Sequence, residues 1–322
     1  MTAPSVSIVV TARHDNYGGD VSERILKPLE FNASRLSERG VAYEVILVEW
    51  DPIPGRAYLS DLLATHLPEL TKRTIRRVIV APEYQTALTQ NPRPFYLEYL
   101  AKNVGIRRAA APFVLVSNVD ILLGRAVVNA LADGRLGHGV IYRAPRYDIK
   151  LGLDHAGVSW DVLEDPANQA TRAVLRPPLF SHGSADFLLA DRETFHRLRG
   201  FNEVYRAARV GIDANFLAKA HGAGHRIEEI TGPVYHINHV GSFRTSKTAA
   251  QDGSVDSSWG NTDWHARYVT YNNPDGWGLG EAPAHQLPDG TTFLEFDWKA
   301  VPTLIELRRL VLPTRPAAVD TA

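Results

Sequence analysis

The sequence contains no cysteine among its 322 residues. This absence excludes disulfides, thiolate nucleophiles and cysteine-ligated zinc or iron–sulfur sites. Any bound metal must therefore be held by oxygen or imidazole ligands. An excess of one charge is also missing, because 35 basic and 36 acidic residues give a net charge of −1. Such a balance is not the electrostatic footprint of a nucleic-acid-binding protein, so we expect no nucleic-acid partner.

Long hydrophobic runs are absent as well. The apolar run at residues 6–10 is too short for a signal peptide and has no basic segment before it. No stretch approaches the length that crosses a bilayer. We therefore expect a cytoplasmic protein with no transmembrane segment, and we leave peripheral contact with a membrane open. A glycosylation sequon at Asn32 is interpreted as a chance match, because no export signal accompanies it.

The first 145 residues alternate short β-rich apolar runs with amphipathic stretches. This alternation is typical of an α/β protein with a largely parallel sheet covered by helices on both faces. The predicted strands are residues 5–11, 43–49, 75–80, 113–117 and 140–143. The predicted helices are residues 21–37, 57–66, 95–108, 192–198 and 214–220.

After residue 143 the pattern becomes irregular, and residues 245–290 are rich in Gly, Ser, Asn, Asp and Trp. That region is too long to be an ordinary connection. We therefore expect a catalytic domain at 1–240, with a nucleotide-binding half at 1–122 and an acceptor or catalytic half at 123–240. Residues 241–322 are expected to form a loop-rich C-terminal extension, either a lid or an acceptor-binding lobe, with an amphipathic segment at 301–312.

Polar residues follow several of the predicted strands. In an open parallel sheet, ligands collect at the carboxyl ends of the strands. The loop after the first strand carries charged groups and the glycine pair Gly18 and Gly19, which permit close backbone approach. A solvated loop capped by Asp20 is the alternative. Asp120 lies just past an apolar strand, where a carboxylate can hold Mg²⁺ or Mn²⁺ against a diphosphate, although such an acid alone is more often a turn or helix cap.

Four segments, residues 6–13, 44–51, 102–120 and 183–213, resemble those of family-2-type glycosyltransferases with the GT-A fold, including the galactosyltransferase-like C-terminal module. Four motifs are similar to those of a bacterial subgroup associated with surface polysaccharides: His14-Asp15-Asn16-Tyr17-Gly18-Gly19, Ser184-Ala185-Asp186-Phe187, Ile212-Asp213 and Tyr235-His236-Ile237-Asn238-His239. The resemblance covers about residues 5–240. It implies a Rossmann-like, mostly parallel sheet flanked by helices.

The resemblance also implies where a nucleotide-sugar donor binds. Ala12, Arg13 and Glu49 would line the nucleoside pocket, and Lys102 and Asn103 would lie beside it. The whole implied donor-binding set is Ala12, Arg13, Asp15, Glu49, Lys102, Asn103, Asn118 and Asp186. Asp186 would contact the donor sugar, and a buried structural acid is an equal alternative.

The metal site implied by the resemblance uses Asp120 as the last acid of an Asp-X-Asp motif. This chain departs from that motif, because Asn118 replaces the first acid, which weakens the assignment without removing it. His236 or His239 would complete the site, and neutral imidazole suits Mn²⁺ better than Mg²⁺. On a strand, residues 236 and 239 point to opposite faces, so we prefer His236.

Asp213 is the candidate catalytic base. In an inverting sugar transfer, a carboxylate takes the proton of the acceptor hydroxyl as its oxygen attacks the anomeric carbon. Asp213 precedes a predicted helix, where it can also serve as an N-cap, and the two uses are compatible because the helix N-terminus favours the ionised form.

Aromatic and basic residues elsewhere carry open alternatives. The tryptophans are either sugar-stacking faces or packing residues: Trp160, Trp259, Trp264 and Trp277. The basic residues either meet a diphosphate or are exposed charges: Arg206, Arg209, Arg244 and Lys247.

The expected function is that of a metal-dependent inverting glycosyltransferase in polysaccharide biosynthesis. It would move a sugar from a nucleoside-diphosphate sugar, UDP-linked, to a hydroxyl of a glycan or small-molecule acceptor. One alternative is a non-catalytic carbohydrate- or nucleotide-binding protein of the same fold, which Asn118 favours. A sugar-1-phosphate nucleotidyltransferase is a weaker alternative, because the usual glycine-rich first loop followed by Thr-Arg is missing. A dehydrogenase is weaker still, since the glycines at 276–280 lack a strand–turn–helix context.

Overall fold

The computed structural model describes residues 3–15, 22–89, 96–150, 158–183, 185–206, 211–237 and 272–302. Their strands form a nine-stranded and a four-stranded sheet. In spatial order, the large sheet consists of β10 (Arg226–Glu229), β6 (Val140–Arg143), β9 (Phe187–Asp191), β4 (Phe113–Ser117), β1 (Val6–Ala12), β2 (Tyr43–Trp50), β3 (Ile75–Val80), β13 (Thr292–Leu294) and β12 (Ala284–Gln286). The small sheet consists of β5 (Ile121–Leu123), β11 (Val234–His236), β7 (Arg146–Ile149) and β8 (Gln169–Arg172).

The large sheet is mostly parallel. From β4 through β1, β2 and β3 to β13, every neighbouring pair is parallel, and β10 is parallel to β6. Only β9, which lies between β4 and β6, and the edge strand β12 run antiparallel to their neighbours. The topology confirms the predicted α/β class. All five predicted strands are present, three of them with the predicted bounds.

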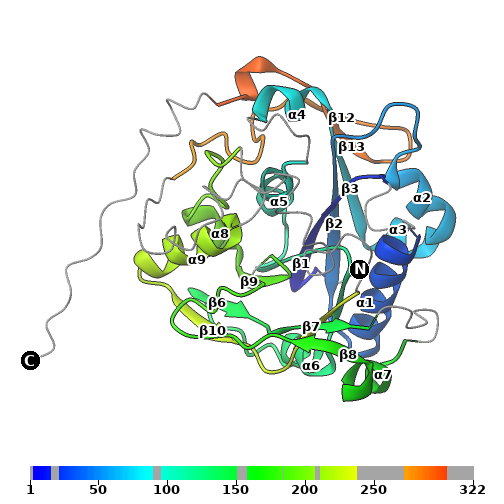
Figure 1. Cartoon of the computed structure of the whole chain (residues 1–322). Helices are drawn as coiled ribbons and strands as arrows, with labels where there is room; N and C mark the ends of the chain where they lie inside the picture. Colours follow the sequence, from blue (N-terminus) through cyan, green and yellow to red (C-terminus); the bar gives the residue numbers. More distant parts are fainter. Residues whose placement is uncertain are drawn as a thin grey trace, which may run out of the picture.

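Helices cover both faces of the large sheet (Figure 1). They are α1 (Lys27–Glu38), α2 (Leu59–His66), α3 (Pro68–Arg73), α4 (Glu83–Leu88), α5 (Glu98–Arg107), α6 (Arg125–Ala132), α8 (Arg192–Arg197) and α9 (Ile212–Gly222). A further helix, α7 (Trp160–Glu164), packs against the small sheet through Leu163. A π-helical turn, Ser22–Leu26, precedes α1, and 3₁₀ turns lie at Pro166–Asn168 and Trp298–Ala300.

Two hydrophobic cores lie on opposite faces of the sheet. Every residue of β1 is buried, and because side chains alternate along a strand, its members divide between the cores. Val9 packs in the core that includes α5, α8 and α9, whereas Ile8 and Val10 pack in the core that includes α1, α2 and α6. The two-sided burial explains why the central strands read as continuous apolar runs.

The predicted helices are all present, with changed ends. The helix predicted at 21–37 begins as the π-helical turn and becomes α-helical at Lys27. The others appear as α2, α5, α8 and α9, and residue 95 of the predicted third helix lies outside the described residues. The sequence did not predict α3, α4, α6 or α7, none of which exceeds eight residues. Helices this short show too few turns for a periodic pattern.

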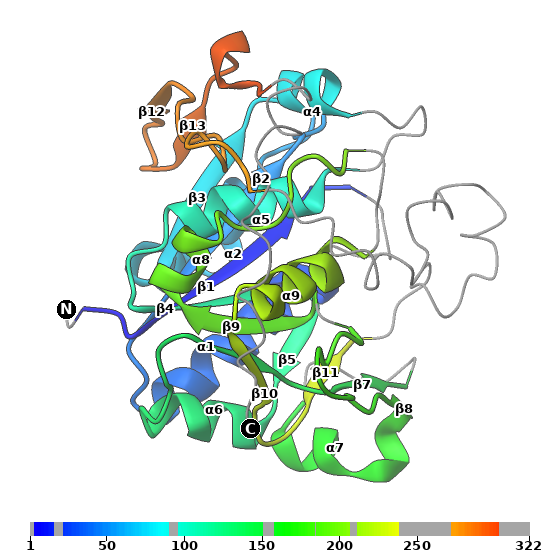
Figure 2. The same ribbon diagram turned by 90° about the vertical axis from the view of Figure 1, so that its left-hand side faces the viewer.

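The described part of the predicted C-terminal extension completes the large sheet. β13 pairs in parallel with β3, and β12 pairs with β13 (Figure 2). Arg107 and Arg108 on α5 donate hydrogen bonds to the carbonyl groups of residues 275–279. Residues 272–302 are therefore integrated into the sheet. Residues 303–312 of the predicted amphipathic segment lie outside the described residues.

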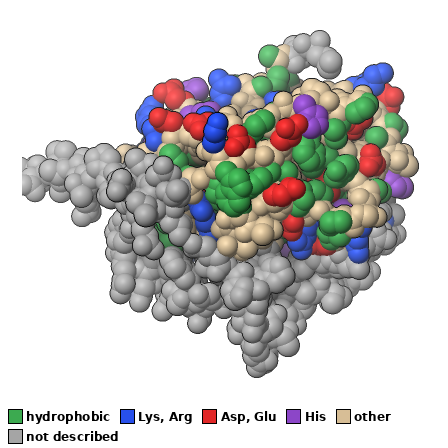
Figure 3. Space-filling view, turned by 90° about the horizontal axis from the view of Figure 1, so that it is seen from above, with side chains coloured by type: hydrophobic (Ala, Val, Ile, Leu, Met, Phe, Trp, Pro, Cys, Tyr) green, Lys and Arg blue, Asp and Glu red, His purple; other side chains and the backbone are tan. Residues whose placement is uncertain are grey.

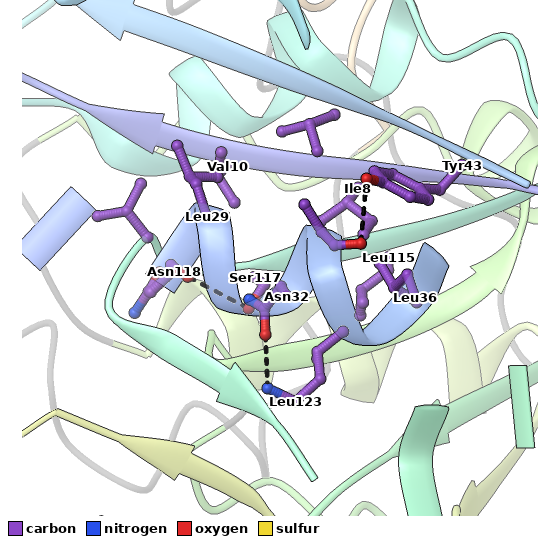
Figure 4. Close-up of a pocket in the computed structure, with 13 residues that line it drawn as sticks. Ile8, Val10, Leu29, Asn32, Leu36, Tyr43, Leu115, Ser117, Asn118 and Leu123 are labelled. Carbon is purple, nitrogen blue, oxygen red and sulfur yellow. Dashed lines mark hydrogen bonds between the residues drawn. The ribbon is translucent and has the colours of Figure 1, made fainter. Parts of the chain in front are cut away.

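Helix α1 is attached to the small sheet through Asn32. Its amide donates to the Ile121 carbonyl at 2.8 Å. It also accepts from the Leu123 N–H at 2.8 Å (Figure 4). The Asn32 amide thus provides hydrogen-bond partners for two backbone groups of β5. Because the amide nitrogen is used in this way, the structure agrees with the interpretation of the sequon as a chance match. A cavity of about 10 Å³ lies between α1 and the sheet, with mainly apolar lining residues. It has room for about one water molecule, so it is a packing defect of the core and not a substrate site.

Within the described ranges, no helix combines the length and apolar composition needed to cross a membrane. On the face seen from above, basic and acidic side chains are interspersed with hydrophobic ones (Figure 3).

Candidate functional site

The ends of β1 and β2 bring together the residues predicted for the nucleoside pocket. Ala12 pairs with Glu49 in the parallel register of the two strands. The Arg13 guanidinium donates to Asp15 at 2.9 Å and to Asp51 at 2.7 Å. The two carboxylates fix the arginine at the carboxyl edge of the sheet. Residues 16–21 of the same loop, including its glycine pair, lie outside the described residues.

Glu49 is buried and bound to a helix terminus. Its Oε2 accepts a hydrogen bond from the Leu59 N–H at 2.7 Å, in the first turn of α2. Burial raises the pKa of Glu49 to about 8, although this hydrogen bond acts in the opposite direction. The carboxyl group therefore retains its proton at neutral pH and has an O–H to donate.

Lys102 and Asn103 are neighbours on α5 but have different partners. The buried Lys102 ammonium donates to Glu98 at 2.5 Å and to Asn118 at 2.7 Å. The Asn103 amide instead donates to the Phe201 carbonyl at 2.8 Å and to Glu203 at 2.9 Å, and accepts from the Phe201 N–H. Lys102 belongs with the polar residues at the strand ends, whereas Asn103 stabilises the turn after α8.

Asn118 connects Lys102 to Asp186. Its Oδ1 accepts from Lys102, and its Nδ2 donates to Asp186 at 2.8 Å. Asp186 also accepts from Arg146 at 2.9 Å. The tight turn before Asp186 uses Gly183 at φ +60°, and a Cβ there would lie 3.3 Å from the Asp186 carboxylate. An aspartate at position 118 would have no hydrogen to donate to Asp186, so the amide suits this position chemically.

Asp120 and His236 face each other across two strands of the small sheet. Asp120 precedes β5, and its carbonyl accepts from the Ile237 N–H at 3.0 Å as β11 pairs with β5. His236 Nε2 lies 3.6 Å from Asp120 Oδ2. The two side chains are close enough for one cation to bind both of these atoms. His239 lies outside the described residues.

The charge of His236 depends on these carboxylates. Burial alone would lower the pKa of His236, but the Asp120 charge and the contact with Asp148 raise it to about 9. A bound cation would take the place of that proton. Among the described residues, no three His, Asp or Glu side chains converge as a metal cage. Asp120 and His236 could therefore provide two ligands for a cation, whose other ligands would have to come from a bound substrate or water.

Asp148, Arg146 and Arg143 are site residues that sequence reasoning missed. Asp148 Oδ1 lies 3.2 Å from His236 Nδ1. Arg146 donates to Asp148 at 2.8 Å as well as to Asp186. The available signal was the alternation of Arg146 and Asp148, which places both on one face of a strand. The region appeared irregular, so no strand was predicted at 146–149.

Asp213 lies in the first turn of α9, after Gly211 at φ +87°. The fully buried Arg143 lies close enough to Asp213 and Asp186 for their charges to raise its pKa, although burial dominates and lowers it to about 10. Tyr99 also adjoins these two acids, since its pKa is raised well above the usual value by burial and then by Asp213, Glu98 and Asp186. Asp186 and Asp213 therefore both lie near the same two side chains, Arg143 and Tyr99.

The remaining candidates are packing residues where they are described. Trp160 lies between Arg35 and Arg125 and donates to the Leu123 carbonyl, and Trp277 is buried in the core. Neither is a free stacking face. Of the two alternatives for Arg206, the exposed charge is wrong, because Arg206 is buried and donates to the Glu203 and Pro302 carbonyls. The other candidates lie outside the described residues: Trp259, Trp264, Arg209, Arg244 and Lys247.

No protein-family model and no curated protein matches the chain. Two solved structures that it resembles are those of GalNAc-T7 with UDP, GalNAc and Mn²⁺, and of the catalytic domain of Drosophila β1,4-galactosyltransferase 7 with xylobiose. The first has a TM-score of 0.49 and 13% identity, covering 74% of this chain and 45% of that one. The second has a TM-score of 0.44 and 14% identity, covering 92% and 96%. At TM-scores below 0.5 we base no functional inference on these likenesses.

Proposed function

We propose that this chain is a GT-A-type, metal-dependent inverting glycosyltransferase that uses a nucleoside-diphosphate sugar, UDP-linked, and a hydroxyl acceptor on a glycan or small molecule. The observation that carries the proposal is the continuous polar network from Lys102 through Asn118, Asp186, Arg146 and Asp148 to His236. His236 lies in turn beside Asp120. Such a network links the two side chains proposed for the metal to Asp186, the acid proposed for the donor sugar.

The nucleoside would bind at the ends of β1 and β2. Arg13 is fixed there by two carboxylates, and Glu49 retains a proton that can be donated to a carbonyl oxygen or ring nitrogen of a base. Asn103 stays outside our proposed donor set, because its amide is committed to residues 201 and 203. We place the catalytic unit at residues 1–240, completed by strands β12 and β13.

The diphosphate would lie against Asp120 and His236. A divalent cation, Mn²⁺ or Mg²⁺, held by these two residues would offset the negative charge that develops on the leaving diphosphate. Lys102 and Arg146 hold Asn118 and Asp186 in fixed orientations, so that Asp186 can accept hydrogen bonds from the sugar hydroxyls. Fixed acceptors of this kind orient the anomeric carbon without further ordering cost.

Asp213 would take the acceptor proton. The acceptor oxygen forms a bond to the anomeric carbon as the bond to the diphosphate breaks, and the hydroxyl proton passes to the Asp213 carboxylate. Asp213 lies in the first turn of α9, where the partial positive charge of the helix N-terminus attracts a negative charge. Because one carboxylate acts on the face opposite the leaving group, the anomeric configuration inverts. The non-catalytic alternative would have no use for this base.

A ligand screen followed by turnover measurements tests the proposal. UDP with Mn²⁺ or Mg²⁺ should raise the unfolding temperature, and a chelator should remove the effect, because a ligand selective for the native state stabilises it. UDP-sugars should then release UDP, and Asp213→Asn and Asp120→Ala should reduce that rate at least about 100-fold. Lack of stabilisation by every nucleoside diphosphate would contradict the proposal, as would a product with retained configuration. Release of pyrophosphate would indicate a nucleotidyltransferase instead.

A further inference from the structure

The small sheet arranges polar groups in one row across neighbouring strands. His236 on β11 pairs with Asp148 on β7, and Asp148 pairs with Thr171 on β8. On the other side, His236 pairs with Ile121, the residue that follows Asp120. Paired residues on adjacent strands point to the same face, so the row brings the Asp148 carboxylate and the His236 ring together.

The Asp148 carboxylate is held on both of its oxygens. Oδ1 accepts from Arg146 Nε at 2.8 Å and lies 3.2 Å from His236 Nδ1. Oδ2 accepts from the Thr171 hydroxyl. Asp148 is thus held by three side chains as a fixed hydrogen-bond acceptor.

When a cation takes the place of one proton of His236, the Asp148 carboxylate determines which ring nitrogen keeps its hydrogen. Asp148 Oδ1 lies 3.2 Å from Nδ1 and can accept from it, so Nδ1 is the nitrogen that keeps hydrogen. The other nitrogen, Nε2, lies 3.6 Å from Asp120 Oδ2 and is the one that would bind a cation together with that carboxylate. Histidine ligands in metal sites commonly donate their second ring N–H to a carboxylate, which fixes the ring and increases its basicity.

We infer that Asp148 is a positioning residue, which fixes the His236 ring so that Nε2 and the Asp120 carboxylate bind one divalent cation. The inference rests on the metal site of the proposed function and adds a residue that does not itself bind the cation. Arg146 holds Asp148 and Asp186 with the same guanidinium, so it connects this arrangement to the proposed sugar site.

Mn²⁺ affinity, measured by the loss of the free-ion electron paramagnetic resonance signal, tests the inference without turnover. The full chain is titrated with Mn²⁺ in saturating UDP. Asp148→Asn should weaken Mn²⁺ binding about 10- to 100-fold, the usual effect of removing the partner of a histidine ligand. An amide oxygen in place of Oδ1 can still accept from His236 and Arg146, but the NH₂ in place of Oδ2 cannot accept from Thr171, and the negative charge beside His236 is lost. Asp148→Ala should weaken binding further.

Asp191→Asn is the matched control. Asp191 is also a buried carboxylate that accepts hydrogen bonds on both oxygens, from Gly139 and Thr194. It caps α8 at the start of that helix, and it pairs with the amino-terminal end of β4. Asp191→Asn should lower the unfolding temperature while changing Mn²⁺ affinity less than about 2-fold. If Asp148→Ala fails to fold, Asp148→Asn still decides the outcome.

The possible failures are distinguishable. If wild type binds Mn²⁺ and His236→Gln does not, but Asp148→Asn binds like wild type, the inference is overturned and the metal site remains. The inference also fails if Asp191→Asn weakens binding as much as Asp148→Asn, because the effect would then be general destabilisation. If wild type with UDP binds no Mn²⁺, the metal site of the proposed function and the inference fall together.

Discussion

At the scale of single residues, Glu49 couples stability to pH. Because burial raises its pKa to about 8 in the folded chain, the folded state retains a proton that the unfolded state loses near pH 4.5. Its contribution to stability is complete below pH 4.5 and is lost as pH rises through 8, at about 1.4 kcal/mol per pH unit. We predict that Glu49→Gln, which can still accept from Leu59, removes this loss.

Urea unfolding at pH 4.5 and pH 8.5 measures that coupling. The two proteins should have similar stability at the lower pH, and Glu49→Gln should be the more stable at the higher pH. Lys219 acts in the opposite direction, since burial lowers its pKa to about 7 and stability rises with pH above that value. Its effect cancels in the difference between variant and wild type. If the stability of wild type and of Glu49→Gln changed equally with pH, the raised pKa of Glu49 would be contradicted.

At the scale of elements, Asn32 attaches α1 to the edge of β5. We predict that Asn32→Ala lowers the free energy of unfolding by about 1–3 kcal/mol, because the Ile121 carbonyl and the Leu123 N–H lose their partner. Denaturant unfolding measures the change. Ser34→Ala on the same helix is the control, since its hydrogen bond to Glu38 is exposed and should be worth less than about 0.5 kcal/mol. Equal effects from the two variants would show that Asn32 does not stabilise β5.

The elements also show how much could be predicted from the sequence. The buried strands β1 to β4 and β6 can be predicted because each is an apolar run in the sequence. The ends of the predicted helices differ from the observed ends by only a few residues. The strands that carry the site, β5, β11 and β7, have three or four residues each. So short a strand has no periodicity, and its partners are far away in the chain. Pairing between β5 and β11 was therefore not predicted, although Asp120 and His236 were.

Site residues were missed for the same reason. Asp148 and Arg143 acquire their roles only from partners that folding supplies: Asp148 from His236 on the next strand, and Arg143 from Asp186 and Asp213. Where the sequence shows no regular hydrophobic pattern, the residues next to a carboxylate or guanidinium do not indicate which distant side chains it will contact. By comparison with the Asp-X-Asp motif of the resembling family, Asn118 is a departure from the expected acid. In the structure its amide accepts from Lys102 and donates to Asp186, so an amide suits this position.

At the scale of the whole molecule, residues 272–302 are needed to complete the fold. Leu294 on β13 is fully buried against the core, and the Tyr84 hydroxyl on α4 donates to the Glu295 carbonyl at 3.0 Å. A chain ending at residue 271 would leave the edge of β3 unpaired and uncover this apolar surface. We predict that it aggregates, whereas a chain ending at residue 302 stays monodisperse in size-exclusion chromatography. A soluble, cooperatively unfolding 1–271 chain would instead identify a separable extension.

The pairing of β3 with β13 also constrains how the protein is made. Arg77 on β3 and its partner Asp289 are 212 positions apart. At a synthesis rate of about 5–20 residues per second, roughly ten to forty seconds separate their emergence from the ribosome. Throughout that interval the nascent chain presents an open strand edge. The adjacent charges of Arg76 and Arg77 lie on that strand, where like charges discourage pairing with other nascent chains until the native partner arrives.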